Sequence, residues 1–401
     1  MASPLRVRAQ AVLTVIAGCV PVATGPPAPE PPPPEVEPPP LTAPESEVPE
    51  PEPELAAPVV GVMLPMSGSP FMREYSELIE EGVRAAVASA SERDGLPVVQ
   101  VIDSGRGVDQ ARRALAELEA AGLSAIVGPL QDAAVARVAE GRRRPVPMIA
   151  PAARELPEGQ AGVYSLAGPD PGPARALGRA AWEQGIRRVV AIAPSTAYAR
   201  FEVETFREAF RLGGGALAGA FYYPPGQVDF RAEVGELIRI DPDAVLLPLP
   251  SLPAMDIPQV AGQVQHYGLD DSLSVDVLGT AGWSTPDVLR DVDVNFTEGV
   301  LTVTARPPGR PEPAYEDFVR AYETVHRKSL RSDVPALGWD IMGLLLAAFR
   351  TGARAPDEVR AALEEIDGFE GATGTLAVEN GRITRVYEVV VIRDRELVRV
   401  Y

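Results

Sequence analysis

Residues 59–68 read VVGVMLPMSG, and this stretch decides the fold class. Its first six residues are apolar or small without alternation, which is typical of a strand buried on both faces of a parallel sheet. The loop that follows places Gly68 between Ser67 and Ser69, so it offers close backbone approach and hydroxyl donors. An amphipathic stretch with helical periodicity then covers residues 74–90. A buried strand, a short loop and a helix begin an α/β fold.

The same alternation of strand and helix continues along the chain. Continuous apolar strands separated by helices form parallel sheets covered on both faces, so the pattern predicts doubly wound sheets. About 340 residues from position 59 onward exceed the usual size of one domain, which predicts two lobes. Segments after Gly299 must complete an earlier sheet or extend the second. Strands are expected at 59–64, 98–103, 125–128, 147–151, 189–194, 215–223, 244–248, 275–280 and 299–304, and helices at 74–90, 109–121, 132–141, 174–184, 198–212, 230–240, 253–267 and 313–329.

The amino end carries the chain's single cysteine, Cys19, after a short apolar run preceded by Arg6 and Arg8. Residues 16–19 read IAGC, which looks like the lipobox of bacterial lipoproteins, so residues 1–18 are expected to be a lipoprotein signal peptide and Cys19 its lipidation site. An ordinary cleaved signal is the alternative. An uncleaved anchor fits poorly, because about ten apolar residues are too few for a span of roughly 20. Val20, where an aspartate often retains lipoproteins at the inner membrane, favours anchoring in the outer membrane, facing the periplasm.

The next segment, residues 19–58, is expected to be a disordered linker. Between positions 21 and 58 it holds sixteen prolines and eight glutamates, with no lysine, arginine or aromatic residue. Such a composition cannot bury enough apolar surface to fold, and prolines favour an extended polyproline conformation. The linker would act as a semi-rigid spacer on the order of 100 Å long, at about 3 Å per residue. The alternative is a disordered tail that has no function as a spacer.

Charge and composition exclude several function classes. The net charge of −19, of which the linker supplies eight negative charges, argues against nucleic acid and against docking on anionic lipid. A single cysteine excludes an internal disulfide. The two histidines, His266 and His326, are far apart and fit capping or solvent-facing positions better than metal ligation. We expect no metal, no cofactor and a monomer bound to the membrane through its lipid anchor only.

The loops at the carboxyl ends of the predicted strands are the candidate ligand site, since ligands of open parallel sheets bind there. Each candidate also has a structural interpretation: Asp132 as a helix N-cap, Tyr198 as packing, Arg154 as a surface charge and Trp283 as interlobe core. As ligand-binding residues the sequence proposes Ser67, Gly68, Ser69, Tyr75, Gln131, Asp132, Ala152, Ala153, Arg154, Tyr198, Ser251 and Trp283, with Tyr75 and Trp283 as aromatic walls.

Several segments resemble type I periplasmic binding proteins of the leucine/isoleucine/valine-binding branch, the substrate-binding proteins of ABC transporters. Residues 59–68 are similar to that family's first strand and loop, and residues 81–87 (EGVRAAV) to its first helix. The order and spacing of the matches span nearly all of residues 59–401. Further matches lie at 125–130, 146–152, 197–200, 222–230, 241–245, 338–340 and the apolar helix after it, and 371–376.

The resemblance implies two lobes joined by three crossovers, which close on a small polar ligand such as an amino acid or another small organic molecule. Lobe 1 would hold residues 59–167 and 281–367, and lobe 2 residues 168–280 and 368–401. Amino-acid-binding members hold the α-carboxylate with a serine and a threonine, where this chain has Gln131 or Asp132, and Arg154. Their lobe 2 glutamate for the α-ammonium falls near residues 280–282, and their tyrosine near Ser251 is missing.

The chain is also similar to the penicillin-binding-protein activator lipoproteins, which share this fold and regulate cell-wall synthases by contact. The partner is therefore an ABC-type permease or, alternatively, a cell-wall synthase. An enzyme is not expected, because the sequence offers no Gly-x-Ser-x-Gly motif, phosphate-binding loop or metal-ligand cluster.

Overall fold

The computed structural model describes residues 56–91, 95–250, 256–268 and 275–400. The chain divides into two units, Met1–Glu54 and Leu55–Tyr401, and the described residues belong to the second. The expected signal peptide, the lipidation site Cys19, most of the expected linker and Ser251 lie outside the described residues.

The first sheet, sheet A, is parallel throughout, with the strand order β2-β1-β3-β4-β5. On one face, Met63 and Ile126 pack against helices α2 and α3; the other face is covered by α1, α11 and α12. Burial on both faces explains why the strands read as continuous apolar runs. The elements are β1 (Val59–Leu64), β2 (Val98–Asp103), β3 (Ala125–Val127), β4 (Met148–Ala150), β5 (Val163–Ser165), α1 (Pro70–Ser89), α2 (Val108–Glu119), α3 (Asp132–Gly141), α11 (Val334–Arg350) and α12 (Pro356–Glu364).

The second sheet, sheet B, has the order β15-β14-β10-β9-β8-β6-β7, and β14 runs antiparallel to both of its neighbours, β10 and the edge strand β15. Helices α4 and α5 pack on one face, and α6 to α9 on the other. Its elements are α4 (Gly172–Glu183), β6 (Arg188–Pro194), α5 (Ala197–Gly213), β7 (Ala216–Tyr223), α6 (Arg231–Ile240), β8 (Ala244–Leu247), α7 (Asp256–Gly268), β9 (Asp276–Gly279), η2 (Ala281–Ser284), α8 (Pro286–Asp291), α9 (Val294–Thr297), β10 (Leu301–Thr304), β14 (Glu388–Arg393) and β15 (Glu396–Arg399).

A small antiparallel sheet, sheet C, shares the core of sheet A. It consists of β11 (Phe369–Gly371), β12 (Gly374–Glu379) and β13 (Arg382–Arg385). Leu376, Val378 and Ile383 lie in the same hydrophobic cluster as Val60 and Val62 of β1. Helix α10 (Pro313–His326) packs on α1. We call sheets A and C with their helices lobe 1, and sheet B with its helices lobe 2.

Three crossovers join the lobes, at residues 166–171, 305–312 and 386–387, as expected. Two segments lie in the opposite lobe from the one expected. Residues 281–304 belong to lobe 2, because β10 pairs with β9 and β14. Residues 368–385 belong to lobe 1, because sheet C fills its core. The second crossover lies in the proline-rich segment 305–312, where Pro307, Pro308 and Pro311 prevent a continuous strand or helix.

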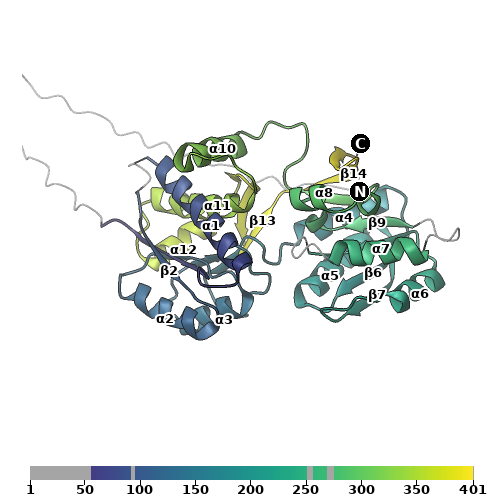
Figure 1. Cartoon of the computed structure of the whole chain (residues 1–401), viewed down its shortest axis with the longest axis horizontal. Helices are drawn as coiled ribbons and strands as arrows, with labels where there is room; N and C mark the ends of the chain where they lie inside the picture. The colour runs from purple at the N-terminus through teal and green to yellow at the C-terminus, as the bar shows by residue number, and fades with distance from the viewer. Residues whose placement is uncertain (1–55, 92–94, 251–255, 269–274, 401) are drawn as a thin grey trace, which may run out of the picture. The chain divides into compact units, whose positions relative to one another are not determined.

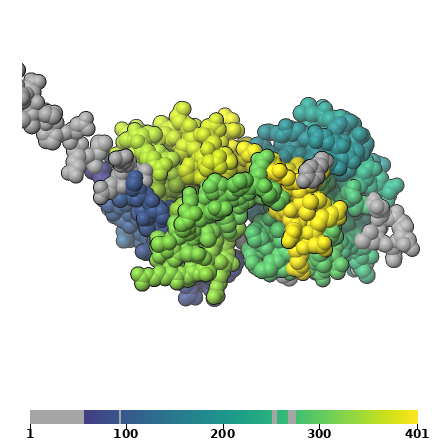
Figure 2. Space-filling view, turned by 90° about the horizontal axis from the view of Figure 1, so that it is seen from above, coloured from purple at the N-terminus to yellow at the C-terminus, as the bar shows by residue number. Residues whose placement is uncertain are grey.

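The expected strands match β1–β4 and β6–β10 to within two residues at each end, and the expected helices correspond to α1–α7 and α10. The sequence pattern did not indicate β5, the short helices η2, α8 and α9, or the five strands β11–β15. Figure 2 shows how the carboxyl-terminal residues, in yellow and yellow-green, return to pack against earlier parts of the chain.

Helices α1 and α11 pack side by side through glycines (Figure 1). A Cβ on Gly82 would overlap the carbonyl oxygen of Pro335, and a Cβ on Gly338 would overlap the carbonyl oxygen of Ile79. The backbones of the two helices therefore approach more closely than any other residue type would allow. This contact joins the amino-terminal part of lobe 1 to a helix that comes about 250 residues later.

Replacing Gly338 by alanine should lower the free energy of unfolding by about 3 kcal/mol, because the helices must separate. Urea denaturation of the purified chain measures the effect. The matched control is Gly235→Ala on α6, where a Cβ meets nothing within 4 Å; there alanine should stabilise by about 0.5–1 kcal/mol. Equal effects at the two positions would contradict the close contact.

Candidate functional site

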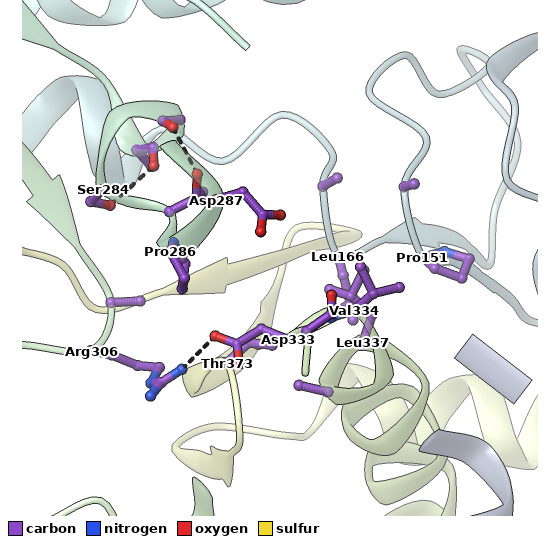
Figure 3. Close-up of a pocket in the computed structure, with 18 of the residues that line it drawn as sticks. Pro151, Leu166, Ser284, Pro286, Asp287, Arg306, Asp333, Val334, Leu337 and Thr373 are labelled. Carbon is purple, nitrogen blue, oxygen red and sulfur yellow. Dashed lines mark hydrogen bonds and ion pairs between the residues drawn. The ribbon is translucent and has the colours of Figure 1, made fainter. Parts of the chain in front are cut away.

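A cavity of about 1300 Å³ lies where loops of both lobes and the crossovers meet. Leu130 and Gln131 after β3 and Pro151, Ala152 and Arg154 after β4 line it from lobe 1. Figure 3 shows Pro286 and Asp287 at the start of α8 facing the same space as Asp333 and Val334 at the start of α11. The cavity therefore occupies the edge of the sheets at which ligands of parallel α/β folds bind. Its aromatic lining comes from Phe71, Tyr75, Tyr198, Tyr315 and Tyr387.

Arg154 is the principal cation of this cavity. Its backbone N–H donates to Asp132 Oδ1 at 2.8 Å, and the N–H of Glu155 donates to the same oxygen at 3.3 Å, which fixes the loop after β4. The guanidinium carbon lies 5.4 Å from the ring centre of Tyr198 on α5. Among the described residues no carboxylate forms an ion pair with this guanidinium. Arg154 thus presents to the cavity a positive charge without a direct ion-pair partner among the described residues, although the buried Glu202 is close enough to interact with it electrostatically.

The neighbouring tyrosines stay protonated. Burial raises the pKa of Tyr75 to about 12, although the charge of Arg154 acts in the opposite direction. Burial also raises the pKa of Tyr198 well above its usual value, again against the effect of Arg154. Both hydroxyls can therefore donate a hydrogen bond to a ligand at neutral pH.

The carboxylates that line the cavity already have partners in the protein. Asp287 pairs with Arg290 at 2.6 Å. Arg306 pairs with Glu312 at 2.8 Å and with Asp333 at 3.0 Å, the latter pair drawn in Figure 3. Asp170 accepts the backbone N–H groups of Gly172 at 2.7 Å and Arg385 at 3.0 Å. Each carboxylate among the described lining residues therefore already has at least one partner in the protein.

A buried polar network ties the first and third crossovers together. Arg385 donates to the carbonyl of Leu166 at 2.8 Å and, through Nε and Nη2, to Thr373 Oγ1 at 3.2 and 3.0 Å. Thr373 Oγ1 in turn donates to Asp340 Oδ2 at 2.6 Å, and Asp340 also accepts the N–H of Ala372. Asp340 is fully buried on α11. The network connects the core of lobe 1 to two of the segments that join the lobes.

A family model described as "Periplasmic binding protein" matches residues 59–396, which is most of the chain and all but the ends of the folded body. The chain belongs to the periplasmic binding protein family. No curated protein matches the sequence significantly. No helix among the described residues is long and apolar enough to cross a bilayer.

Solved structures share the fold of this periplasmic binding protein. An ABC transporter substrate-binding protein from Sphaerobacter thermophilus has a TM-score of 0.70 at 21% identity, over 86% of this chain and 97% of that one. The branched-chain amino acid binding protein LivJ from Streptococcus pneumoniae str. Canada MDR_19A, in complex with isoleucine, has a TM-score of 0.65 at 20% identity, over 85% and 97%. A solute-binding protein from Rhodopseudomonas palustris BisB5, in complex with 3,4-dihydroxybenzoic acid, has a TM-score of 0.65 at 20% identity, over 85% and 94%.

Five of the residues proposed from the sequence line the cavity together: Tyr75, Gln131, Ala152, Arg154 and Tyr198. Asp132 and Ala153 lie behind it. Gln131, not Asp132, is the N-cap residue of α3, and the Asp132 side chain instead holds the backbone of Arg154. Ala153 is fully buried, and its carbonyl accepts from the Ser165 hydroxyl.

The loop 67–69 lies beside the large cavity. The Ser67 N–H donates to Asp103 at 3.2 Å, and the Ser69 hydroxyl caps α1 by accepting the N–H of Met72 at 3.3 Å. Gly68 and Ser69 line a smaller cavity together with Gln131. The Ser67 backbone N–H and the Ser69 hydroxyl therefore fix the loop and the start of the helix, and neither serine lines the large cavity.

Trp283 is not an aromatic wall. It is fully buried in the core of lobe 2, and its indole N–H donates to the carbonyl of Leu247 at 2.9 Å. The 3-10 turn η2 directs the ring back over Gly279 and away from the cavity. Sequence reasoning also missed the lining residues of the crossovers, Asp170, Arg306 and Tyr387, and those of sheet C, Thr373 and Arg385. Only the proline-rich composition of residues 305–312 offered a signal for one of these segments.

Glu202 on α5 lies close to this site without lining it, and its side chain is 4% exposed. Burial raises the pKa of its carboxyl from 4.5 to about 7, although the charge of Arg154 and a hydrogen bond with Thr280 oppose the rise. The folded protein therefore binds this proton more tightly than the unfolded chain. The contribution of Glu202 to stability is full below pH 4.5 and is lost as the pH rises to about 7.

In the variant Glu202→Gln, the free energy of unfolding should not show this decrease as the pH rises. At pH 8.5 it should exceed the unmodified protein by on the order of 3 kcal/mol in free energy of unfolding, and at pH 4 the two should be similar. Urea denaturation across this pH range measures the difference. Glu204→Gln, an exposed position on the same helix, serves as the control and should change little. Parallel pH profiles for Glu202→Gln and the unmodified protein would exclude a raised pKa.

Proposed function

We propose that this protein is an extracytoplasmic solute receptor for an ABC-type transporter and that its ligand is a small organic carboxylate. The guanidinium of Arg154, which lines the cavity and has no direct ion-pair partner among the described residues, carries the proposal. A charged hydrogen bond to a carboxylate is worth more than a neutral one, and it gains strength where protein walls exclude water. The adjacent hydroxyls of Tyr75 and Tyr198 would donate to the same group or its neighbour.

An acid without an ammonium group fits this cavity better than an α-amino acid. Each described carboxylate that lines the cavity has a partner in the protein, so an ammonium group would be buried without compensation, which is costly. The aromatic lining suits a flat apolar body. Both ligand types occur on this fold, as isoleucine in the streptococcal protein and 3,4-dihydroxybenzoic acid in the Rhodopseudomonas protein.

Closure of the lobes about the crossovers would bring Arg154 and Tyr198 onto the ligand from opposite sides, since they belong to different lobes. The closed form would be presented to the transporter. The amino-terminal segment would tether the body to the membrane through a lipid on Cys19, with the Pro/Glu-rich linker as spacer. The anchoring membrane would be the outer one, on the periplasmic side.

Native mass spectrometry of the purified chain, followed by denaturing extraction, tests the proposal. A stoichiometric organic acid whose return raises the melting temperature would support it. A ligand-free mass, together with no thermal response to benzoates, alkanoates or amino acids, would contradict it and favour the contact activator of cell-wall synthases.

The variant Arg154→Gln should weaken carboxylate binding by about 10- to 100-fold, because a charged hydrogen bond is lost. Isothermal titration calorimetry measures the dissociation constant. Arg144→Gln is the matched control, since Arg144 is exposed and lines no described cavity. An unchanged affinity in Arg154→Gln would remove Arg154 from the site.

The variant Cys19→Ser should abolish lipid attachment and release the protein into the soluble periplasmic fraction. Cell fractionation and mass analysis of the amino-terminal peptide measure both effects. Membrane association that persists with an unaltered amino terminus would show that Cys19 is not the anchor.

A further inference from the structure

A second cavity, of about 570 Å³, opens beside the first at the carboxyl ends of β1 and β2. Its walls are the loop after β1, the first turn of α1 and the loop after β2. Met72 and Gln131 line both cavities, so the two spaces adjoin. A ligand held by Arg154 could extend across these two side chains into the smaller cavity.

Two arginines, Arg73 and Arg106, line the smaller cavity, and no carboxylate does. Arg106 is held in place because its Nε donates to the carbonyl of Ser67 at 2.5 Å and its backbone N–H donates to Gln110 Oε1 at 2.6 Å. Arg73 lies in the first turn of α1, and its backbone N–H donates to Ser69 at 2.9 Å. Among the described residues neither guanidinium forms an ion pair.

Many exposed arginines of this chain pair with a nearby carboxylate, whereas Arg73 and Arg106 line the smaller cavity without one. Asp103, three residues before Arg106, is engaged elsewhere. Its Oδ1 accepts the N–H groups of Ser67 and Gly105, at 3.2 and 2.8 Å. Although burial acts to raise its pKa, these hydrogen bonds lower it overall, so Asp103 is an anion satisfied by the loop itself. The first turn of α1 is capped by Ser69, so attraction for an anion comes from the arginines.

We propose that the ligand is dianionic: one carboxylate binds at Arg154, and a second carboxylate binds between Arg73 and Arg106. The body of the ligand then crosses Met72 and Gln131. This inference rests on the proposed function, since it assigns the second half of the same ligand. It predicts selection of dicarboxylates over monocarboxylates of equal length.

Isothermal titration calorimetry on the purified full chain tests this selection. The probes are benzoate against benzene-1,4-dicarboxylate, and alkanoates against alkanedioates from four to eight carbons. At least one dicarboxylate should bind about 10-fold more tightly than its matched monocarboxylate. The double variant Arg73→Ala/Arg106→Ala should abolish that advantage and leave monocarboxylate affinity within about 2-fold, because Arg154 is retained.

The control is Arg113→Ala/Arg144→Ala, which removes the same charge from exposed positions of lobe 1 that line no described cavity. It should keep the full preference for dicarboxylates. The inference is overturned if matched pairs bind equally at every length, or if the Arg73/Arg106 variant keeps the preference. If no probe of either class binds, the proposed carboxylate receptor fails as well. If monocarboxylates bind in a way that depends on Arg154 but dicarboxylates bind no more tightly, the proposed receptor function stands. Only the second subsite is then rejected.

Discussion

The hydrogen bonds of Asp340 organise the region on which the rest of the molecule depends. This buried carboxylate on α11 holds the turn between β11 and β12 through Ala372 and Thr373. Thr373 positions the guanidinium of Arg385, which reaches the first crossover at Leu166. A buried charge is tolerated only when its hydrogen-bonding capacity is used in this way. Each residue of this network is hydrogen-bonded to the next. The first and third crossovers therefore have one defined geometry beside the cavity.

Hydrogen bonds and ion pairs within the protein also determine the electrostatic character of the cavity. The acidic side chains near the cavity make hydrogen bonds or ion pairs with other parts of the protein. Asp132 accepts a hydrogen bond from the backbone of Arg154, Asp170 accepts one from the backbone of Arg385, and Asp333 pairs with Arg306. Arg154, in contrast, forms no ion pair among the described residues. A strongly acidic chain thereby presents positive charge where its two lobes meet. Local pairing, and not net charge, decides the sign of a binding site.

The sequence predicted sheet A and most of sheet B because their strands are apolar on both faces. It did not predict β11–β15: β11, β13 and β15 are short, and β12 alternates between buried and half-buried side chains, whereas β14 carries an apolar run, residues 389–392, that was overlooked. Loop positions after strands identified Arg154 and Tyr198 correctly as lining residues, since sheet topology fixes where those loops lie. The direction of a side chain within a loop is set by tertiary contacts, so Trp283 and Arg154 looked equally suitable in sequence. The crossover residues that line the cavity come from segments far apart in the sequence, so only the folded structure shows that they lie together.

The glycine contact between α1 and α11 has a consequence for the order in which the protein acquires structure. Strands β1–β5 and helix α1 are synthesised first, yet the helix that covers them, and sheet C behind it, lie beyond the whole of β6–β10. A chain that emerges amino end first must therefore hold an incomplete lobe 1, with one apolar sheet face covered only by α1, until β6–β10 have been made. Contacts between such distant segments form slowly. The late synthesis of α11 therefore leaves an interval in which lobe 1 cannot complete its packing, however stable the finished protein is.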